Sequence, residues 1–146
     1  MPFALFYISR NNVPETAHSE ELAKILDVSL EYNRAHAITG ALVSTPVHYA
    51  QILEGPRGAV GDLMRRIETD PRHRDISFLA RETLPQRSFP RWSLAHVGSS
   101  RELESAIERM ANRASQGPSP GEVWSLWNLM SDLAHRHYDA DPSSAT

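Results

Sequence analysis

Three polar side chains occupy positions where the hydrophobic pattern of the chain calls for apolar residues. Tyr7 lies within an apolar strand, and Gln51 alternates with Tyr49 and Leu53 along another strand. Asn33 extends the apolar stripe of a helix. A buried amide or phenol without a partner costs roughly 1–3 kcal/mol, so each of the three needs a hydrogen-bond partner. One such residue alone is usually satisfied by its neighbours, whereas three that converge indicate a binding site.

A flat ring with donors and acceptors on its rim would satisfy an amide, a second amide and a phenol together. The apolar residues Ile25, Leu42 and Ile67 are predicted to wall such a slot between the sheet and its helices. Ligand sites are mostly apolar clefts with a few polar groups that fix orientation. The pattern therefore favours a flat heteroaromatic ligand, and the isoalloxazine ring of a flavin fits this description.

The elements that position these residues follow the order β-α-β-β-α-β, with a fifth strand after them. This order is typical of a ferredoxin-like α+β fold, an antiparallel-rich sheet with two helices packed on one face. Helical spacing of apolar residues and breaks at proline or glycine set the boundaries. The expected elements are a strand at 3–9, a helix that opens at Glu20 and ends before Ile38, strands at 38–44 and 47–53, a helix from Pro56 to Asp70, and strands at 75–84 and about 91–97.

Residues 1–98 are expected to form this core, and residues 99–146 a helical C-terminal extension. The core carries 11 basic and 11 acidic residues, and the extension carries 4 and 7, so the net charge of −3 comes from the extension. Two amphipathic helices are predicted there, followed by a disordered end at 139–146. We expect these helices to cover the exposed sheet face, to form an oligomer interface through Trp124 and Trp127, or both.

The composition excludes several classes of function. The chain has no cysteine, which rules out disulfides, thiolate metal sites and a cysteine nucleophile. No apolar run reaches the roughly 20 residues of a membrane helix, and no signal peptide is recognisable, so we expect a cytoplasmic protein. A slightly acidic balance gives no reason to expect nucleic-acid binding. We predict no metal site, since His135-Arg-His137 has no carboxylates at ligand spacing.

Five segments in order resemble the BLUF family, the blue-light sensors that use FAD. The resemblance covers about residues 3–97 and implies the ferredoxin-like fold, with the flavin held between the two core helices. FMN is the possible alternative cofactor, since the ring contacts would be shared. The matching segments are FYISR (6–10), Asn33 six residues before Thr39-Gly40, QILEGP (51–56), IETDPRH (67–73) and RSFPRWSL (87–94).

The resemblance also implies roles for individual residues. Tyr7 would donate an electron and a proton to the excited flavin, and Gln51 would rearrange its amide between Tyr7 and the ring. Asn33 would bond the polar rim of the ring. The other implied positions are Ile25, Leu42 and Ile67 around the ring, Asp70, Arg72 and His73 near the ring and side chain of the cofactor, and Trp92 and Leu94 in the fifth strand as the coupling to output.

One departure from the family pattern concerns output. Leu94 stands where the family generally has methionine, which preserves volume but loses the polarizable thioether. The photochemistry needs only Tyr7, Gln51 and the flavin, so the change bears on signal transmission. No cyclase, phosphodiesterase or DNA-binding motif follows residue 98. We therefore expect a sensor that is not an enzyme and that signals through a homo-oligomer, a dimer or larger, or through a separate protein partner.

Two other functions remain as alternatives. A ferredoxin-like interaction module could have lost its flavin, although the buried polar groups at Tyr7, Asn33 and Gln51 argue against this. An acylphosphatase-like hydrolase would need an arginine-bearing anion loop after the first strand, for which Arg10 is the candidate. The spaced glycines from Gly55 to Gly61 lack the spacing and the lysine of a phosphate loop.

Overall fold

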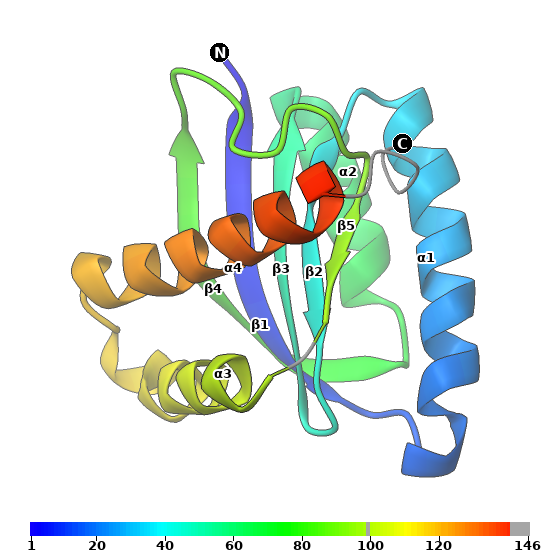
Figure 1. The fold of residues 1–146 in the computed structure, drawn as a ribbon, viewed down its shortest axis with the longest axis vertical. Coiled ribbons are helices and arrows are strands. Elements are labelled where there is room, and N and C mark those ends of the chain that lie inside the picture. Colours follow the sequence, from blue (N-terminus) through cyan, green and yellow to red (C-terminus); the bar gives the residue numbers. More distant parts are fainter. Residues whose placement is uncertain (99, 141–146) are drawn as a thin grey trace.

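The fold is a five-stranded mixed sheet covered by helices on both faces. The structure is a computed structural model, and it describes residues 1–98 and 100–140. The strand order is β4-β1-β3-β2-β5. Helices α3 and α4 cross the front of the sheet in Figure 1, and α1 and α2 lie on the other side. The elements are β1 (Phe3–Asn11), α1 (His18–Ala35), β2 (Thr39–Ser44), β3 (His48–Gly55), α2 (Arg57–Glu68), β4 (His73–Thr83), β5 (Ala95–Val97), α3 (Arg101–Arg113) and α4 (Pro120–Ala140), with 3-10 turns at Glu15–Ala17 and Ala114–Gln116.

The strand pairing confirms the predicted ferredoxin-like α+β fold. Strand β1 pairs antiparallel with β4 and with the central strand β3, and β2 pairs antiparallel with β3 on its other side. Only three residue pairs join β2 to β5, and this pairing is parallel. The β1–β3 register places Tyr7 directly opposite Gln51. Residues directly opposite each other on paired strands lie on the same sheet face, and both side chains line the cavity on the face that α1 and α2 cover.

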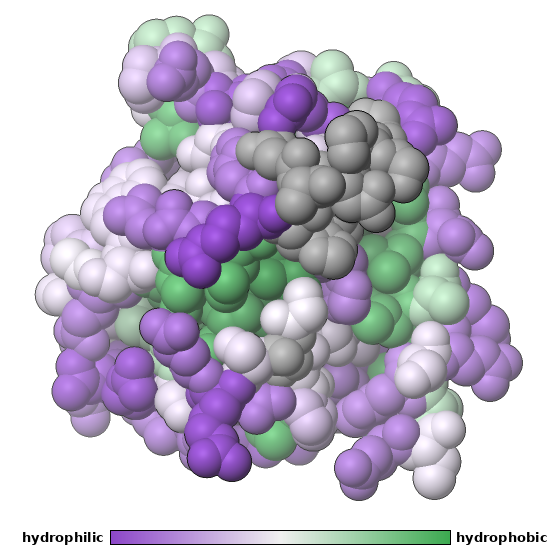
Figure 2. Space-filling model, viewed as in Figure 1, coloured by the Kyte–Doolittle hydropathy of each residue, from purple (hydrophilic) through white to green (hydrophobic). Residues whose placement is uncertain are grey.

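The opposite sheet face carries the main hydrophobic core. Phe6 and Ile52 are fully buried there and pack in one cluster with residues of α3 and α4, such as Ile107 and Met130. The two C-terminal helices thus cover the sheet face that the core helices leave open. Figure 2 shows this side of the molecule, where an apolar area remains visible among largely polar residues.

The fifth strand is shorter than predicted, and this corrects the placement of Trp92 and Leu94. Both residues lie in the segment before β5, which begins only at Ala95. The physical reason is that backbone groups of this segment have other partners. The carbonyl of Ser93 accepts a hydrogen bond from the Asn33 side chain, and the carbonyl of Trp92 accepts from the Gly40 amide. These groups are therefore not available for a regular ladder.

Two smaller observations complete the architecture. Gly40 in β2 is required by close backbone contact, because a Cβ there would lie 2.0 Å from the carbonyl oxygen of Ile52. Helix α4 continues to Ala140, so it includes the first two residues of the end that we expected to be disordered. The rest of that end, 141–146, lies outside the described residues. No helix in the described part of the chain is long and apolar enough to span a membrane.

Candidate functional site

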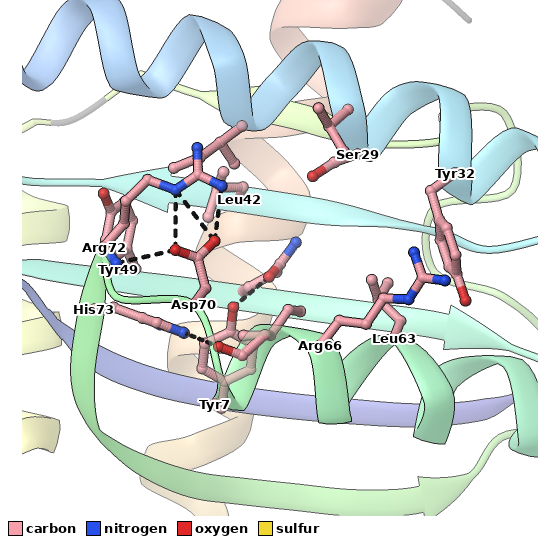
Figure 3. Close-up of a pocket in the computed structure, with 14 residues that line it drawn as sticks. Tyr7, Ser29, Tyr32, Leu42, Tyr49, Leu63, Arg66, Asp70, Arg72 and His73 are labelled. Carbon is pink, nitrogen blue, oxygen red and sulfur yellow. Dashed lines mark hydrogen bonds and ion pairs between the residues drawn. The ribbon is translucent and has the colours of Figure 1, made fainter.

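A cavity of about 140 Å³ opens between the sheet and the two core helices (Figure 3). Its walls come from β1, β2, β3, α1, α2, the turn that follows α2 and the first residue of β4. Asn33, which we predicted at this site, does not line it. The predicted residues that do line it are Tyr7, Ile25, Leu42, Gln51, Ile67, Asp70, Arg72 and His73.

Tyr7 and Gln51 form a direct hydrogen bond at the floor of the cavity. The Tyr7 hydroxyl donates to Gln51 Oε1, and both side chains are almost completely buried. Burial raises the pKa of the Tyr7 hydroxyl far above its ordinary value, and the negative charges of Asp70 and ionised Tyr49 act in the same direction. The phenol therefore keeps its proton at physiological pH and holds the amide in a defined orientation.

Asn33 is fully buried near the C-terminal end of α1, with half of its amide satisfied. Its Nδ2 donates to the backbone carbonyl of Ser93 at 2.8 Å, which ties α1 to the segment before β5. Its Oδ1 is buried and has no donor among the described residues. A buried polar atom without a partner is costly, and such atoms are rare in folded proteins. This acceptor lacks a donor in the described part of the chain, although Asn33 itself does not line the cavity.

The turn after α2 places Asp70 and Arg72 at one end of the cavity. The Arg72 guanidinium donates to both carboxylate oxygens of Asp70, at 2.8 to 3.1 Å, and the Arg72 backbone amide donates as well. Burial alone would raise the pKa of Asp70, but these bonds from Arg72 outweigh it and lower the pKa. Glu21 on α1 also lies 3.7 Å from Arg72, so this guanidinium is shared between two carboxylates.

His73 is held by hydrogen bonds at both ring nitrogens. Nε2 contacts the carbonyl oxygen of Ile67 at 2.5 Å, and Nδ1 contacts the Ser9 hydroxyl at 2.8 Å. A carbonyl can only accept, so we assign the proton to Nε2 and let the Ser9 hydroxyl donate to Nδ1. The ring then stands edge-on to the rings of Tyr7 and Tyr49, each at 6.1 Å between centroids.

Six further residues, which we had not predicted as site residues, also line the cavity. The helical spacing from Ile25 predicts some of them, since residues three, four and seven positions on share one helix face. Tyr49 lies on the same face of β3 as Gln51, two residues before it. Arg66 is the charged residue among the six. Its guanidinium packs over the Tyr32 ring at 4.5 Å, and spacing in the sequence alone does not reveal this contact. The six are Val28, Ser29, Tyr32, Tyr49, Leu63 and Arg66.

Trp92 and Leu94 point to opposite faces of the sheet. Trp92 packs in the cluster with α3 and α4, and its ring lies 4.7 Å from the His135 ring of α4. Leu94 packs with Leu42 and Tyr49, which line the cavity, and with α1. The short segment before β5 therefore contacts both the cavity wall and the C-terminal helices.

Together, the ferredoxin-like sheet, the buried phenol–amide pair and the apolar cavity between two helices define an α+β domain whose cavity suits a flat ligand. The sequence matches the BLUF family, described as "Sensors of blue-light using FAD", over residues 3–95. The chain therefore belongs to the BLUF family, and the cofactor of that family is FAD. The resemblance that the sequence motifs suggested is confirmed.

Relatives and solved structures agree with this assignment. The chain is 35% identical over 91 residues to "Photoactivated adenylate cyclase subunit beta" of Euglena gracilis, which is 62% of this chain and 10% of that protein. It is 29% identical over 82 residues to "Blue light- and temperature-regulated antirepressor BluF" of Escherichia coli (strain K12), which is 56% of this chain and 20% of that protein. The chain thus matches only about a tenth to a fifth of these curated relatives.

Two solved structures match most of the chain. "BlrB - a BLUF protein, dark state structure" has a TM-score of 0.74 and 30% identity, covering 90% of this chain and 96% of that chain. "BlsA photo-activated state" has a TM-score of 0.76 and 25% identity, covering 90% of this chain and 95% of that chain. The match to both extends beyond residue 95, so the C-terminal helices take part in the likeness.

Proposed function

We propose that Tyr7 and Gln51 are the photochemical pair of this blue-light sensor. The observation that carries the proposal is the buried hydrogen bond from the Tyr7 hydroxyl to Gln51 Oε1 at the floor of the cavity. A phenol is an electron donor, and its proton already has an acceptor in place. An amide offers an acceptor at one end and a donor at the other, so its rotation reverses the hydrogen-bond pattern.

The residues of the cavity fit FAD. Ile25, Leu42 and Ile67 provide apolar walls for a flat ring. Asn33 lies outside this lining, and its unpartnered Oδ1 would bond the ring edge only if the side chain turned toward the cavity. Arg72 lies at one end of the cavity, where a guanidinium suits a phosphate group of the cofactor. These ring contacts would hold FMN as well. Bound FAD supplies absorption of blue light and, once excited, a strong one-electron oxidant.

Tyr7 gives up an electron after illumination, and its hydroxyl proton passes to the Gln51 side chain. The electron and a proton return to Tyr7, so Tyr7 and Gln51 are both neutral again, while the Gln51 amide is left rotated or in another tautomer. The net reaction converts no substrate, so the chain acts as a sensor and not as an enzyme. The stored difference is one or two hydrogen bonds, each worth about 1 kcal/mol net.

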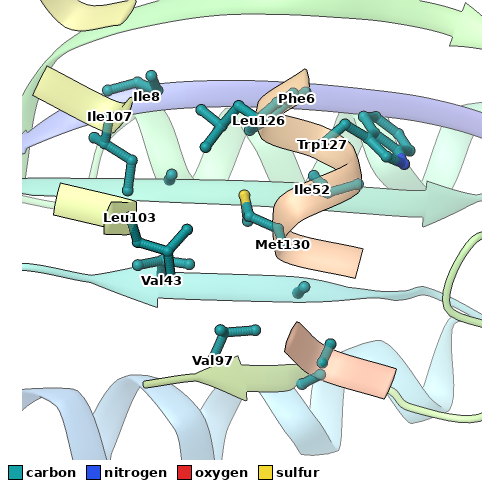
Figure 4. Packing of buried hydrophobic residues seen from close by; sticks show 14 of the residues in the cluster. Phe6, Ile8, Val43, Ile52, Val97, Leu103, Ile107, Leu126, Trp127 and Met130 are labelled. Atoms are coloured by element: carbon teal, nitrogen blue, oxygen red, sulfur yellow. The ribbon is translucent and has the colours of Figure 1, made fainter. Parts of the chain in front are cut away.

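Such a small difference needs an output element that is nearly balanced between two arrangements. Residues 1–98 would be the sensor, and the helices of 99–146 the output. The link would be the segment with Trp92 and Leu94, which contacts both sides of the sheet. Figure 4 shows how residues of α3 and α4 interlock with the sheet, so a shift of this segment would change their packing.

The target of this output would be a second copy of the chain or a separate protein. Trp124 and Trp127 lie together on α4, with 5.0 Å between ring centroids, and Trp124 is only partly buried. Large aromatic side chains often dominate protein interfaces. Trp127 is 3% exposed and packs against Phe6 of the sheet, so it covers the sheet face and does not offer an interface. The partly buried Trp124 is the tryptophan that supports self-association or binding of a partner through α4.

The test is the absorption spectrum of the purified chain loaded with FAD in the dark. We expect a flavin band that shifts reversibly to longer wavelength under blue light. Tyr7→Phe and Gln51→Ala should still bind FAD but lose this shift. A normal shift in both variants would refute the assigned pair, and a protein that cannot be loaded with flavin would refute the proposed function.

A further inference from the structure

The cavity contains a second buried phenol that the proposed mechanism does not use. Tyr49 lies on β3, two residues before Gln51, and its side chain lines the same cavity. Its relative exposure is 6%, close to the 3% of Tyr7. Two phenols therefore share one buried wall of the proposed flavin site.

The strand register makes these phenols diagonal neighbours. Tyr7 pairs with Gln51, and Ser9 pairs with Tyr49, on adjacent antiparallel strands. Diagonal neighbours on one sheet face have a separation of about 7–8 Å. The ring of His73 lies edge-on to both phenols at 6.1 Å, so the three rings form one aromatic group.

The hydroxyl of Tyr49 differs from that of Tyr7 in one respect. Tyr7 donates to Gln51, whereas the Tyr49 hydroxyl has no hydrogen-bond partner among the described residues. The Tyr49 hydroxyl oxygen is not fully enclosed by the described residues, so water can reach it. A proton lost from Tyr49 would pass to water and not to an amide that can return it.

The third phenol of the cavity, Tyr32, is in a different setting. Its ring stacks on His36 at 4.0 Å and is covered by the Arg66 guanidinium. Figure 3 shows Tyr32 and Tyr49 at opposite ends of the cavity, with Tyr49 beside Asp70 and Arg72. Arg72 also acts on Tyr49, but Asp70 and Glu21 pair with Arg72 and oppose its effect. The Arg66 cation lies directly over the Tyr32 ring and disfavours loss of an electron, so Tyr32 is the weaker candidate donor.

We propose that Tyr49 is a second electron donor of the cavity and competes with Tyr7 for the light-excited flavin. This inference rests on the proposed function. The Tyr49 phenol loses one electron, the flavin gains that electron, and the phenol proton goes to water at the open side of the cavity. The product on the protein is a neutral tyrosyl radical, which the returning electron and a proton from water restore to tyrosine. This route leaves the Gln51 amide unchanged and yields no signal.

The test compares four forms of the full chain loaded with FAD: wild type, Tyr7→Phe, Tyr7→Phe/Tyr49→Phe and Tyr7→Phe/Tyr49→Trp. The emission lifetime of bound FAD and the tyrosyl radical yield, by transient absorption, are measured for each. FAD stoichiometry is measured as well, so that only equally loaded samples are compared. Tyr32 is present in every form and serves as the internal comparison.

We expect Tyr7→Phe to lose the red shift but to retain a short emission lifetime and a tyrosyl radical. The Tyr7→Phe/Tyr49→Phe variant should lose the radical and show a longer lifetime, and Tyr49→Trp in the same background should restore the short lifetime. Equal lifetimes and radical yields in the single and the double phenylalanine variant would overturn the proposal. A red shift that persists in Tyr7→Phe is a separate result, since it would overturn the role of Tyr7 instead.

Discussion

The buried carboxylate of Glu54 allows a quantitative prediction about the segment that carries Trp92 and Leu94. Glu54 is fully buried on β3 and accepts hydrogen bonds from the backbone amides of Ser88 and Phe89, each at 2.7 Å. It thereby fastens the segment before β5 to the sheet. We expect removal of this carboxylate to loosen the proposed link between the cavity and α4.

The variant Glu54→Ala leaves two backbone amides without their acceptor, the buried amide of Phe89 and the half-buried amide of Ser88. Each orphaned group costs about 1–3 kcal/mol, so the sum is about 2–6 kcal/mol. Burying the carboxylate costs free energy in the wild type, and the alanine variant avoids this cost, which offsets part of the loss from the two amides. We expect the free energy of unfolding to fall by about 2–4 kcal/mol. Urea unfolding measures it, with Glu82→Ala on the exposed side of β4 as the control. A loss below about 0.5 kcal/mol, the usual range for surface substitutions, would refute the role of Glu54.

The pH dependence of the same variant gives a second check. Burial raises the pKa of Glu54, against the opposing effect of the Ser88 and Phe89 amides. A raised pKa means that the folded state holds this proton more tightly than the unfolded state. The stability contributed by Glu54 is therefore complete below the ordinary carboxyl pKa and decreases as the pH rises through the raised value. The difference between wild type and Glu54→Ala should be larger at acid pH than at neutral pH, and the opposite trend would show that the amides outweigh burial.

Three further predictions concern other parts of the chain. Gly40→Ala should prevent folding or strongly destabilise the sheet, because the new Cβ would collide with the Ile52 carbonyl. Gly58→Ala in α2 is the matched control: its Cβ would meet open space, and urea unfolding should show a gain of up to about 1 kcal/mol in stability. Leu94→Met should cost less than about 1.5 kcal/mol and change the rate of dark recovery; unchanged recovery and oligomeric state would show that the position matters little. Asp70→Asn should lower stability at neutral pH and match wild type below the pKa that Arg72 depresses, as thermal unfolding across pH can test.

The fold was predictable because its elements have clear local signals. Apolar alternation predicted the four main strands, and Pro56 and Asp70 correctly bracketed α2. The fifth strand was predicted too long, since the aromatic and apolar residues at 91–94 match strand preferences. Their backbone partners come from Asn33 and Gly40, which are distant in sequence, so no local pattern could reveal them.

The candidate site was predictable where polar residues interrupt an apolar pattern. Tyr7 and Gln51 stood out in this way, and they form a hydrogen bond with each other. Asn33 stood out as well, but its amide bonds the carbonyl of Ser93, a partner 60 positions away. Tyr32 and Arg66 have ordinary helix-surface spacing, and only the packing of α1 beside α2 brings them together.

The central claim is that light changes the hydrogen bonds of the Gln51 side chain. The most direct measurement is the light-minus-dark infrared difference spectrum of the FAD-loaded chain, with and without isotope-labelled glutamine. We predict amide bands that shift with the label in wild type and are absent in Gln51→Ala. A visible red shift of the flavin without any label-sensitive glutamine band would contradict the account.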